Sequence, residues 1–208
     1  MKSSSPLSRS QYGIYIECVS HKGESFYNLP YIYKLDRALD EKRLLEAIKT
    51  AFMAHPTLFT RIELNDDGEP VQTLDMATEQ WNLSVEPIRD IEQMKSQLVQ
   101  PYDIYGDRLF HVRLLRDDNN YYLFLDYHHI IVDGTSMQVM LQDIDKAYHG
   151  EQQIHHCRSQ DAVQAEFKDG QDYPAGGQCL FFERLAFPVE EIFLHYAYPL
   201  LLDLEIMS

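Results

Sequence analysis

Two apolar strands joined by a short polar turn constrain the fold of this chain most. Residues 108–116 (RLFHVRLLR) alternate in polarity, DDNN follows, and residues 120–127 (NYYLFLDY) return as a second strand rich in aromatic side chains. This order predicts an antiparallel hairpin. A second hairpin is predicted where residues 57–64 (TLFTRIEL) precede the turn NDDGEP and the strand VQTLD. The hairpins therefore favour a mixed sheet over a purely parallel one.

Three stretches with helical spacing of apolar residues accompany these strands. One begins after Asp40 and ends at Pro56, one covers residues 88–99, and one follows Asp133. Their apolar faces consist of Leu44, Leu45, Ile48, Ala51 and Phe52; of Ile88, Ile91, Met94, Leu98 and Val99; and of Met137, Met140, Leu141, Ile144 and Tyr148. We therefore predict an α/β (α+β) two-layer sandwich over residues 1–155, with a mixed sheet and helices packed on one face.

The remaining segments are less regular. Residues 7–19 have partly helical spacing, and residues 26–36 predict a strand in which Pro30 marks an edge or a bend. Beyond residue 155 the pattern degrades, and residues 180–206 are strongly apolar without a clean period. We expect residues 156–208 to be a divergent tail, from a truncated or frame-shifted gene or from a fragment of a longer domain.

Charge and cysteine content narrow the classes of function. The chain has 33 acidic and 18 basic residues and a net charge of −15, which argues against binding to nucleic acid or to an anionic membrane. Residues 1–10 lack the apolar stretch of a signal peptide, and no run approaches the length of a membrane-spanning helix. The odd set Cys18, Cys157 and Cys179 contains no CxxC pair. We therefore predict a cytoplasmic protein without a disulfide framework.

Two adjacent histidines provide the candidate chemistry. His128 and His129 end an apolar strand, and Asp133 and Gly134 open the next helix. Because a strand has a period of two, the two histidines project to opposite faces, so that at most one faces a given cleft while the other is packed. Asp133 is placed to cap the helix, whose first N–H groups carry the positive end of the helix dipole. A histidine there is a candidate general base with a nearby oxyanion stabiliser.

A purely structural histidine pair and a metal site are the alternatives at this position. The carboxylates and imidazole nearest to the pair in sequence are Asp126, Asp133 and His111, and together they form no recognised ligand spacing. Residues 155–157 (HHC) resemble a ligand cluster but lie in poorly patterned sequence. We therefore predict no metal site.

The whole string at residues 128–134, HHxxxDG, resembles the signature of the chloramphenicol acetyltransferase-like superfamily, in particular of nonribosomal peptide synthetase condensation domains. Ser136 and the apolar residues after it resemble the continuation of that motif. Residues 101–115 are similar to the family segment PFDL…PLFRVxLL, residues 54–61 to RHExLRTxF, and residues 7–15 to LSxAQ. Order and spacing agree over most of the chain.

The resemblance implies a function and a role for each residue. His129 would take a proton from, or position, an acceptor amine that attacks a thioester, and the product would be an amide. His128 would be a packed, supporting histidine, Asp133 would form a structural ion pair with an arginine, and the Gly134 region would offer a backbone donor near the reacting carbonyl. Donor and acceptor would arrive on the phosphopantetheine arms of carrier proteins, in contact with other synthetase domains and without a bound metal or redox cofactor.

Two departures from the family accompany the resemblance. Phe59 stands where the family has the arginine that pairs with the motif aspartate, and we hypothesise that Arg61, on the same strand face, replaces it. A complete condensation domain also has two lobes and about twice this length, with the site between them. We therefore expect a half domain that retains His129, is inactive alone and self-associates through its uncovered lobe face.

Two other functions remain open from the sequence. One is a stand-alone trimeric O-acyltransferase of the chloramphenicol acetyltransferase type, which would use acetyl-CoA. Its histidine motif lies near the C-terminus, whereas here the motif is at residue 128 of 208, so the motif position favours the condensation domain. The other is a non-catalytic module that binds carrier proteins. The sequence identifies neither the substrates nor the product.

Overall fold

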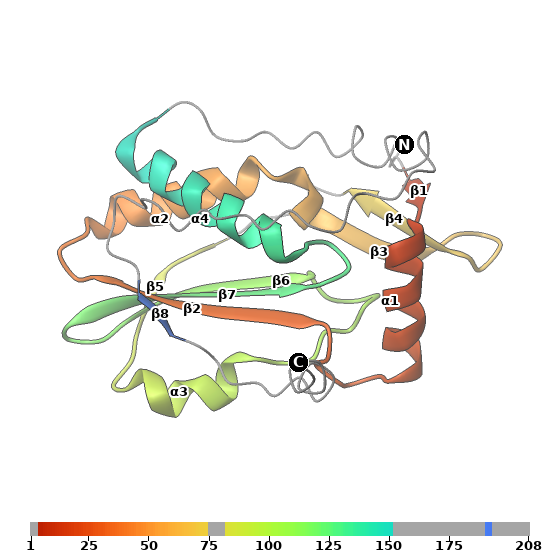
Figure 1. The fold of residues 1–208 in the computed structure, drawn as a ribbon, viewed down its shortest axis with the longest axis horizontal. Coiled ribbons are helices and arrows are strands. Elements are labelled where there is room, and N and C mark those ends of the chain that lie inside the picture. The colour runs from red at the N-terminus through yellow and green to blue at the C-terminus, as the bar shows by residue number, and fades with distance from the viewer. Residues whose placement is uncertain (1–3, 75–81, 152–189, 193–208) are drawn as a thin grey trace, which may run out of the picture.

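The computed structural model describes residues 4–74, 82–151 and 190–192, which form two sheets and the helices around them (Figure 1). The larger sheet has the strand order β5-β6-β7-β2-β8, and the smaller has the order β1-β4-β3. The strands are β1 (Ser4–Pro6), β2 (Asn28–Asp36), β3 (Thr60–Leu64), β4 (Pro70–Leu74), β5 (Val85–Pro87), β6 (Phe110–Arg116), β7 (Asn120–His128) and β8 (Glu190–Ile192). The helices are α1 (Arg9–Ser20), α2 (Glu41–Met53), η1 (Pro56–Phe59), α3 (Ile91–Leu98) and α4 (Gly134–His149).

The centre of the larger sheet is the long antiparallel pair of β2 and β7. Nine residue pairs run without interruption from Asn28 opposite His128 to Asp36 opposite Asn120. β6 lies antiparallel on the other side of β7, which confirms the hairpin predicted for residues 108–127. β5 is parallel to its neighbour β6, so the sheet is mixed, as predicted.

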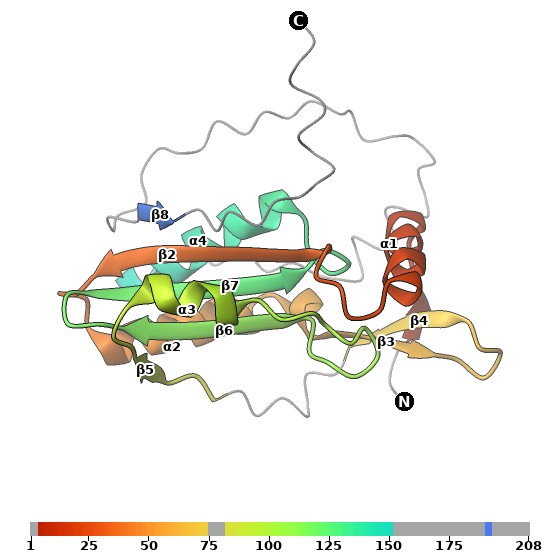
Figure 2. The same ribbon diagram turned by 90° about the horizontal axis from the view of Figure 1, so that it is seen from below.

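Helices cover both faces of this sheet, which corrects one part of the prediction (Figures 1 and 2). α2 and α4 pack on one face, as expected, against a core that includes Leu123 and Leu125 of β7. α3 packs on the opposite face, where Tyr122 and Phe124 form a second core. The physical reason is that β7 has apolar side chains at both odd and even positions, so both faces of the strand must be buried against other elements.

The hairpin predicted from residue 57 begins later than expected. Residues 57–59 belong to the 3-10 helix η1, and only Thr60–Leu64 forms the strand β3, which pairs with β4. Pro56 is the first residue of η1, and its fixed φ angle favours a helical turn at this position. Leu58 and Phe59 are buried by that turn.

Caps set the ends of the predicted helices. Asp40 accepts a hydrogen bond from the backbone N–H of Arg43 at the start of α2, as the sequence predicts. Gly150 ends α4 at a φ of 76°, a left-handed conformation that favours glycine. The helix predicted over residues 88–99 is shorter, and Asp90 caps it.

The edge strands complete the larger sheet. Among the described residues, β8 pairs with β2 at Ile32, Tyr33 and Lys34, and Pro30 lies outside that pairing. From the predicted tail, the structure describes β8 alone. The motif HHC at residues 155–157, Cys157 and Cys179 lie outside the described residues.

Candidate active site

His129 lies in the turn directly after β7, with its side chain exposed. Its Nδ1 is 2.9 Å from the carbonyl oxygen of Val132. A carbonyl oxygen only accepts hydrogen bonds, so the network assigns the ring proton to Nδ1. The Nε2 atom of the neutral ring then carries the lone pair that can accept a proton. The turn therefore presents a histidine in the tautomer that a general base requires.

His128, the last residue of β7, is 4% exposed, whereas His129 is exposed, so one histidine is packed and the other is not, as predicted. Its Nδ1 accepts the backbone N–H of Ile130 at 3.2 Å, so Nε2 carries the proton and donates it to the Sγ of Cys18 at 3.4 Å. Burial, and next the adjacent His129, lower the pKa of His128 to about 4. Its ring packs near those of Tyr27 and Tyr102. The buried ring of His128 is therefore neutral at neutral pH.

Backbone hydrogen bonds fix the turn that carries His129. The N–H of His128 donates to the carbonyl of Leu109 at 2.9 Å, and the N–H of His129 donates to the carbonyl of Tyr27 at 2.8 Å. The N–H of Ile131 donates back to the carbonyl of His128 at 3.1 Å. The position of the candidate base is thus set by two neighbouring segments rather than by the turn alone.

Asp133 and Ser136 form a capping box at the start of α4. The Oδ1 of Asp133 accepts the backbone N–H of Ser136 at 2.9 Å and its hydroxyl at 2.7 Å, while the N–H of Asp133 donates to the Ser136 Oγ at 3.3 Å. This confirms the predicted cap. Gly134 is the first residue of α4, so its backbone belongs to the positive end of the helix dipole.

Arg61 and Phe59 lie at the junction of η1 and β3. Phe59 is 2% exposed and packs edge-on against Phe110, with ring centroids 5.6 Å apart, so the position where the family has an arginine belongs to the apolar core. Arg61 is partly buried in β3, opposite Thr73 of β4. Its hypothesised ion pair with Asp133 stays a prediction.

A buried polar group near the end of β7 was not singled out as functional from the sequence. Asp126 is fully buried, and its Oδ2 accepts the side-chain N–H of Asn28 at 2.8 Å. Burial raises the pKa of Asp126 to about 7. Tyr102 donates its hydroxyl to the Asp126 backbone carbonyl at 2.9 Å and stacks on His111 at 4.8 Å. This cluster supports the strand end from the face that holds His128.

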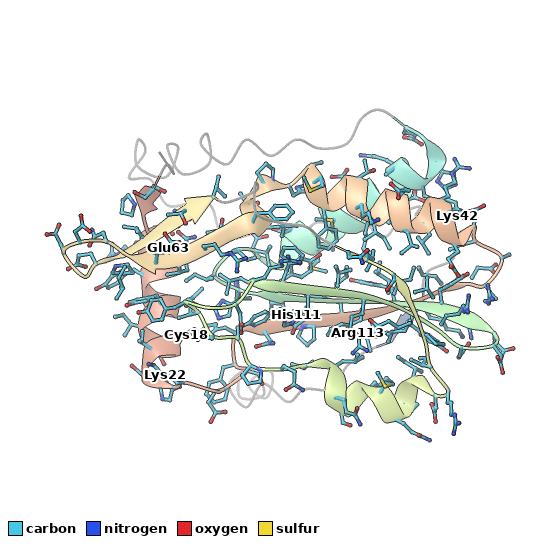
Figure 3. The ribbon with its side chains drawn as sticks, turned by 180° about the vertical axis from the view of Figure 1, so that it is seen from behind. Cys18, Lys22, Lys42, Glu63, His111 and Arg113 are labelled. Atoms are coloured by element: carbon cyan, nitrogen blue, oxygen red, sulfur yellow. The ribbon has the colours of Figure 1, made fainter. Side chains whose placement is uncertain are left out.

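The residues considered as metal ligands do not form a site in the part of the chain that the structure describes. There, no group of three His, Cys, Asp or Glu side chains is placed to hold an ion. Figure 3 shows His111 on the sheet and Cys18 on α1. Burial raises the pKa of Cys18 to about 11, and burial lowers that of His111. Cys18 is thus a thiol at neutral pH.

Two contacts of the histidine turn were not predicted. Cys18 meets His128 across 110 positions of sequence, and Gln11 donates its side-chain N–H to the carbonyl of Ile130 across 119. The motif around residues 7–15 was the available signal for Gln11, although it does not indicate the contact. Both residues come from α1, which stands at the end of the sheet (Figure 2).

The comparisons with known proteins agree with this arrangement. The family model "Condensation domain" matches residues 1–170. Gramicidin S synthase 2 of Aneurinibacillus migulanus is 36% identical over 150 residues, which are 71% of this chain and 3% of that protein. The starter condensation domain of the rhizomide synthetase has the same fold, with a TM-score of 0.68 and 18% identity, and the match covers 79% of this chain and 43% of that one. A mutant of that domain in complex with C8-CoA and Leu-SNAC matches with a TM-score of 0.67 and 17% identity, and the match covers 79% of this chain and 41% of that one.

The matches also show how much of a relative the chain represents. It spans 2% to 6% of the length of the curated synthetases it matches and less than half of the solved condensation domains. Those curated relatives are subunits of multidomain synthetases. No helix among the described residues is long and apolar enough to cross a membrane. From its motif, its fold and the family match over most of its length, the chain belongs to the condensation-domain family.

Proposed function

We propose that this chain carries the histidine-bearing half of a condensation site that forms amide bonds in nonribosomal peptide synthesis. The observation that carries the proposal is the hydrogen bond from the Nδ1 of His129 to the carbonyl of Val132 at 2.9 Å. It orients an exposed imidazole with Nε2 as the proton acceptor, at the end of β7 and before the N-terminus of α4. A neutral histidine is the side chain best suited to proton transfer near neutral pH.

The proposed reaction is the aminolysis of a thioester. The nitrogen of the acceptor amine attacks the thioester carbonyl carbon, and a C–N bond forms as the carbonyl oxygen takes negative charge. His129 takes the proton of the amine on Nε2. The C–S bond then breaks, the carbonyl re-forms, and the proton passes to the leaving sulfur. The products are an amide and a thiol, without an oxidant, a reductant or a resident cofactor.

The start of α4 would stabilise the charge that develops on the oxygen. The first N–H groups of a helix are oriented donors at the positive end of its dipole. The capping box of Asp133 and Ser136 fixes the direction of this helix start, and Gly134 is its first residue. We assign Gly134 as the backbone donor in the proposed site and Asp133 and Ser136 as its structural supports.

The proposed substrates are acyl and aminoacyl groups on the phosphopantetheine arms of carrier proteins. The curated relatives are synthetase subunits, and the rhizomide domain binds C8-CoA, whose acyl group is a thioester like that on a carrier arm. Because this chain matches less than half of a solved condensation domain, we propose that it needs a second lobe for turnover.

The test is reconstitution of turnover from two halves. The chain is mixed with the second half of the gramicidin S synthase 2 condensation domain and with donor and acceptor carrier proteins loaded with aminoacyl thioesters. Amide formation is followed by mass spectrometry. His129→Ala should lower the rate at least about a hundredfold, as expected for loss of a general base. The matched control is His149→Ala, which removes an exposed histidine at the end of α4.

Two outcomes would contradict the proposal. One is a rate for His129→Ala equal to that of the unchanged chain in an active mixture. The other is a mixture that binds both halves and forms no amide with any loaded pair, which would favour a non-catalytic role in binding carrier proteins.

A further inference from the structure

Gln11 of the N-terminal helix α1 makes a side-chain hydrogen bond to the turn that carries His129. The Nε2 of Gln11 donates to the carbonyl oxygen of Ile130 at 3.0 Å. Ile130 follows His129 directly, and its carbonyl belongs to the turn rather than to a strand or helix. The contact therefore holds the candidate site from outside the segment that contains the histidine motif.

The amide of Gln11 has hydrogen bonds from both of its ends. Its Oε1 accepts the backbone N–H of Ser8 at 2.9 Å, and its Nε2 donates both to Ile130 and to the Oε1 of Gln72 at 3.2 Å. Gln72 in turn donates its Nε2 to the carbonyl of Pro6 at 3.1 Å. A flipped Gln11 amide would place its oxygen against the Ile130 carbonyl and its NH2 against the Ser8 N–H, so only one orientation fits.

The peptide groups on both sides of Ile130 are held as well. Its N–H donates to the Nδ1 of His128, and its side chain is 2% exposed in a core cluster with Leu7, Tyr15 and Ile62. The hydrogen bond from the Gln11 side chain to the Ile130 carbonyl holds the peptide group that follows. A change at Ile130 would therefore reach His129, whose own ring bonds to a carbonyl within the same turn.

We propose that Gln11 is a positioning residue for His129. By fixing the Ile130 carbonyl it holds the turn in the shape that lets His129 Nδ1 donate to Val132 and keep Nε2 free of the ring proton. Gln11 acts through the turn and does not touch the reacting atoms. This inference rests on the proposed function of His129 for its catalytic meaning, whereas the geometric effect on the ring is independent of turnover.

The variant Gln11→Glu isolates the contact. A glutamate retains an oxygen for the Ser8 N–H, so the start of α1 keeps its capping box, but it loses both N–H groups and places an acceptor against the Ile130 carbonyl. The matched control is Ser8→Ala, which removes the side-chain cap of α1 and leaves the Gln11 donors in place. Both variants act on the same helix start, and only the first removes the bond to the turn.

The primary measurement is nitrogen-15 NMR of the His129 ring in the full chain, assigned by comparison with His129→Ala. In the unchanged chain and in Ser8→Ala we expect the Nδ1–H tautomer to dominate. In Gln11→Glu we expect loss of that dominance, with the two ring nitrogens moving toward averaged shifts. Should Gln11→Glu fail to fold, Gln11→Met supplies a second test: it has the same length and removes both the donor to the turn and the acceptor for the Ser8 N–H, and Ser8→Ala then controls for the weakened cap.

The outcomes separate the two proposals. A folded Gln11→Glu or Gln11→Met variant whose His129 ring keeps the Nδ1–H signature would overturn the positioning role. So would a Ser8→Ala variant that loses the signature, because helix stability alone would then explain the effect. In the reconstituted reaction, Gln11→Glu should lower kcat about tenfold with KM for the acceptor unchanged. If His129→Ala had no effect on turnover, the proposed function would fail while the ring measurement still stood.

Discussion

Burial shifts the pKa values of two titratable side chains at the end of β7 in opposite directions. His128 is held neutral in the protein interior, with its pKa lowered to about 4, while Asp126 on the same face has its pKa raised to about 7. His129, the next residue along the chain, is exposed. Burial therefore favours the uncharged form of both groups, which is the deprotonated form of the histidine and the protonated form of the aspartate.

These two pKa shifts have opposite effects on stability as pH changes. For His128 the pKa in the folded state lies below the ordinary value of 6.5. Its contribution to the free energy of unfolding is therefore complete above pH 6.5 and is lost as pH falls toward 4. For Asp126 the folded pKa lies above 3.8, so its contribution is complete below pH 3.8 and is lost as pH rises toward 7. Each effect is on the order of 3 kcal/mol. Between pH 4 and pH 6.5 the two contributions to the slope of the free energy of unfolding against pH should therefore nearly cancel.

We therefore predict that, in the variant Asp126→Asn, the pH dependence of stability that His128 contributes becomes measurable. The free energy of unfolding of the variant should fall as pH is lowered from 6.5 to 4, by on the order of 3 kcal/mol more than that of the unchanged chain. Urea denaturation over this pH range measures it. Asp118→Asn, at an exposed position in the turn before β7, is the control and should leave the profile unchanged. Equal profiles for Asp126→Asn and the unchanged chain would contradict the prediction.

The placement of individual site residues was predictable where it follows from the alternation of side chains along a strand or from the position of a helix cap. The opposite orientation of His128 and His129 follows from the period of a strand, and the Asp133 cap follows from its place before a helix. The contacts of Cys18 and Gln11 were not predictable, because each joins segments more than a hundred positions apart. Local pattern carries no information about which distant side chain meets a turn.

At the level of elements, the direction of α4 depends on its first residues. Asp133 accepts two hydrogen bonds from Ser136 there. We expect Asp133→Ala to lower the free energy of unfolding by about 1 kcal/mol, and Asp133→Ser to recover most of it, since serine also caps helices. Asp40→Ala at the start of α2 should cost a similar amount. Only Asp133→Ala should also lower turnover in the reconstituted reaction, and an equal effect of both on turnover would contradict the assignment.

A buried contact joins α4 to the segment between α2 and η1. The Nε2 of His55 lies 2.8 Å from the Oδ2 of Asp143, whose side chain is fully buried. Removal of either residue takes a hydrogen bond from a buried polar group, so the free energy of unfolding of each alanine variant should fall by about 1–3 kcal/mol.

A double-mutant cycle tests this contact. We expect the cycle of His55→Ala with Asp143→Ala to give a coupling energy of about 1 kcal/mol or more, measured by urea denaturation. The surface pair of Glu46 and Lys49, at 3.7 Å, is the control, and its cycle should give about 0.5 kcal/mol or less. A coupling at His55 and Asp143 no larger than that of the control would show that this buried contact adds no more stability than a surface ion pair.

The elements themselves were largely predictable, and the exceptions have physical causes. The hairpin of β6 and β7 and the helices α2 and α4 follow from clear periodicity and caps. The 3-10 turn η1 was predicted as strand, since the apolar run of residues 57–64 looks the same in both conformations. The position of α3 on the second face was also missed, because amphipathic spacing says that a helix packs and does not say on which side of a sheet.

For the whole molecule, the uncovered surface predicts association. Tyr12 and Ile16 lie one turn apart on α1 and are each 44% exposed, and the chain matches less than half of a solved condensation domain. We expect light scattering on a size-exclusion column to show a mass that rises with concentration. Tyr12→Ser with Ile16→Ser should reduce that rise, whereas Leu64→Ser, an exposed apolar residue of β3, should not.

Other masses would change the interpretation. A concentration-independent trimer near three times 24.4 kDa would favour the stand-alone O-acyltransferase, which would then be assayed with acetyl-CoA. A strict monomer at all concentrations would contradict the predicted self-association and leave the half-domain proposal to the reconstitution experiment.

The unbroken pairing of β2 with β7 has a consequence at the level of the gene. Nine successive pairs leave no bulge in which an extra residue is absorbed. An in-frame insertion of one codon within β7 would move every residue after it by one position, so that Tyr127 would take the buried position beside Cys18 and His128 the exposed position of His129. The motif would be intact in sequence, while His129 would leave the position from which its ring contacts Val132. Alleles of this gene should therefore preserve the length of β7.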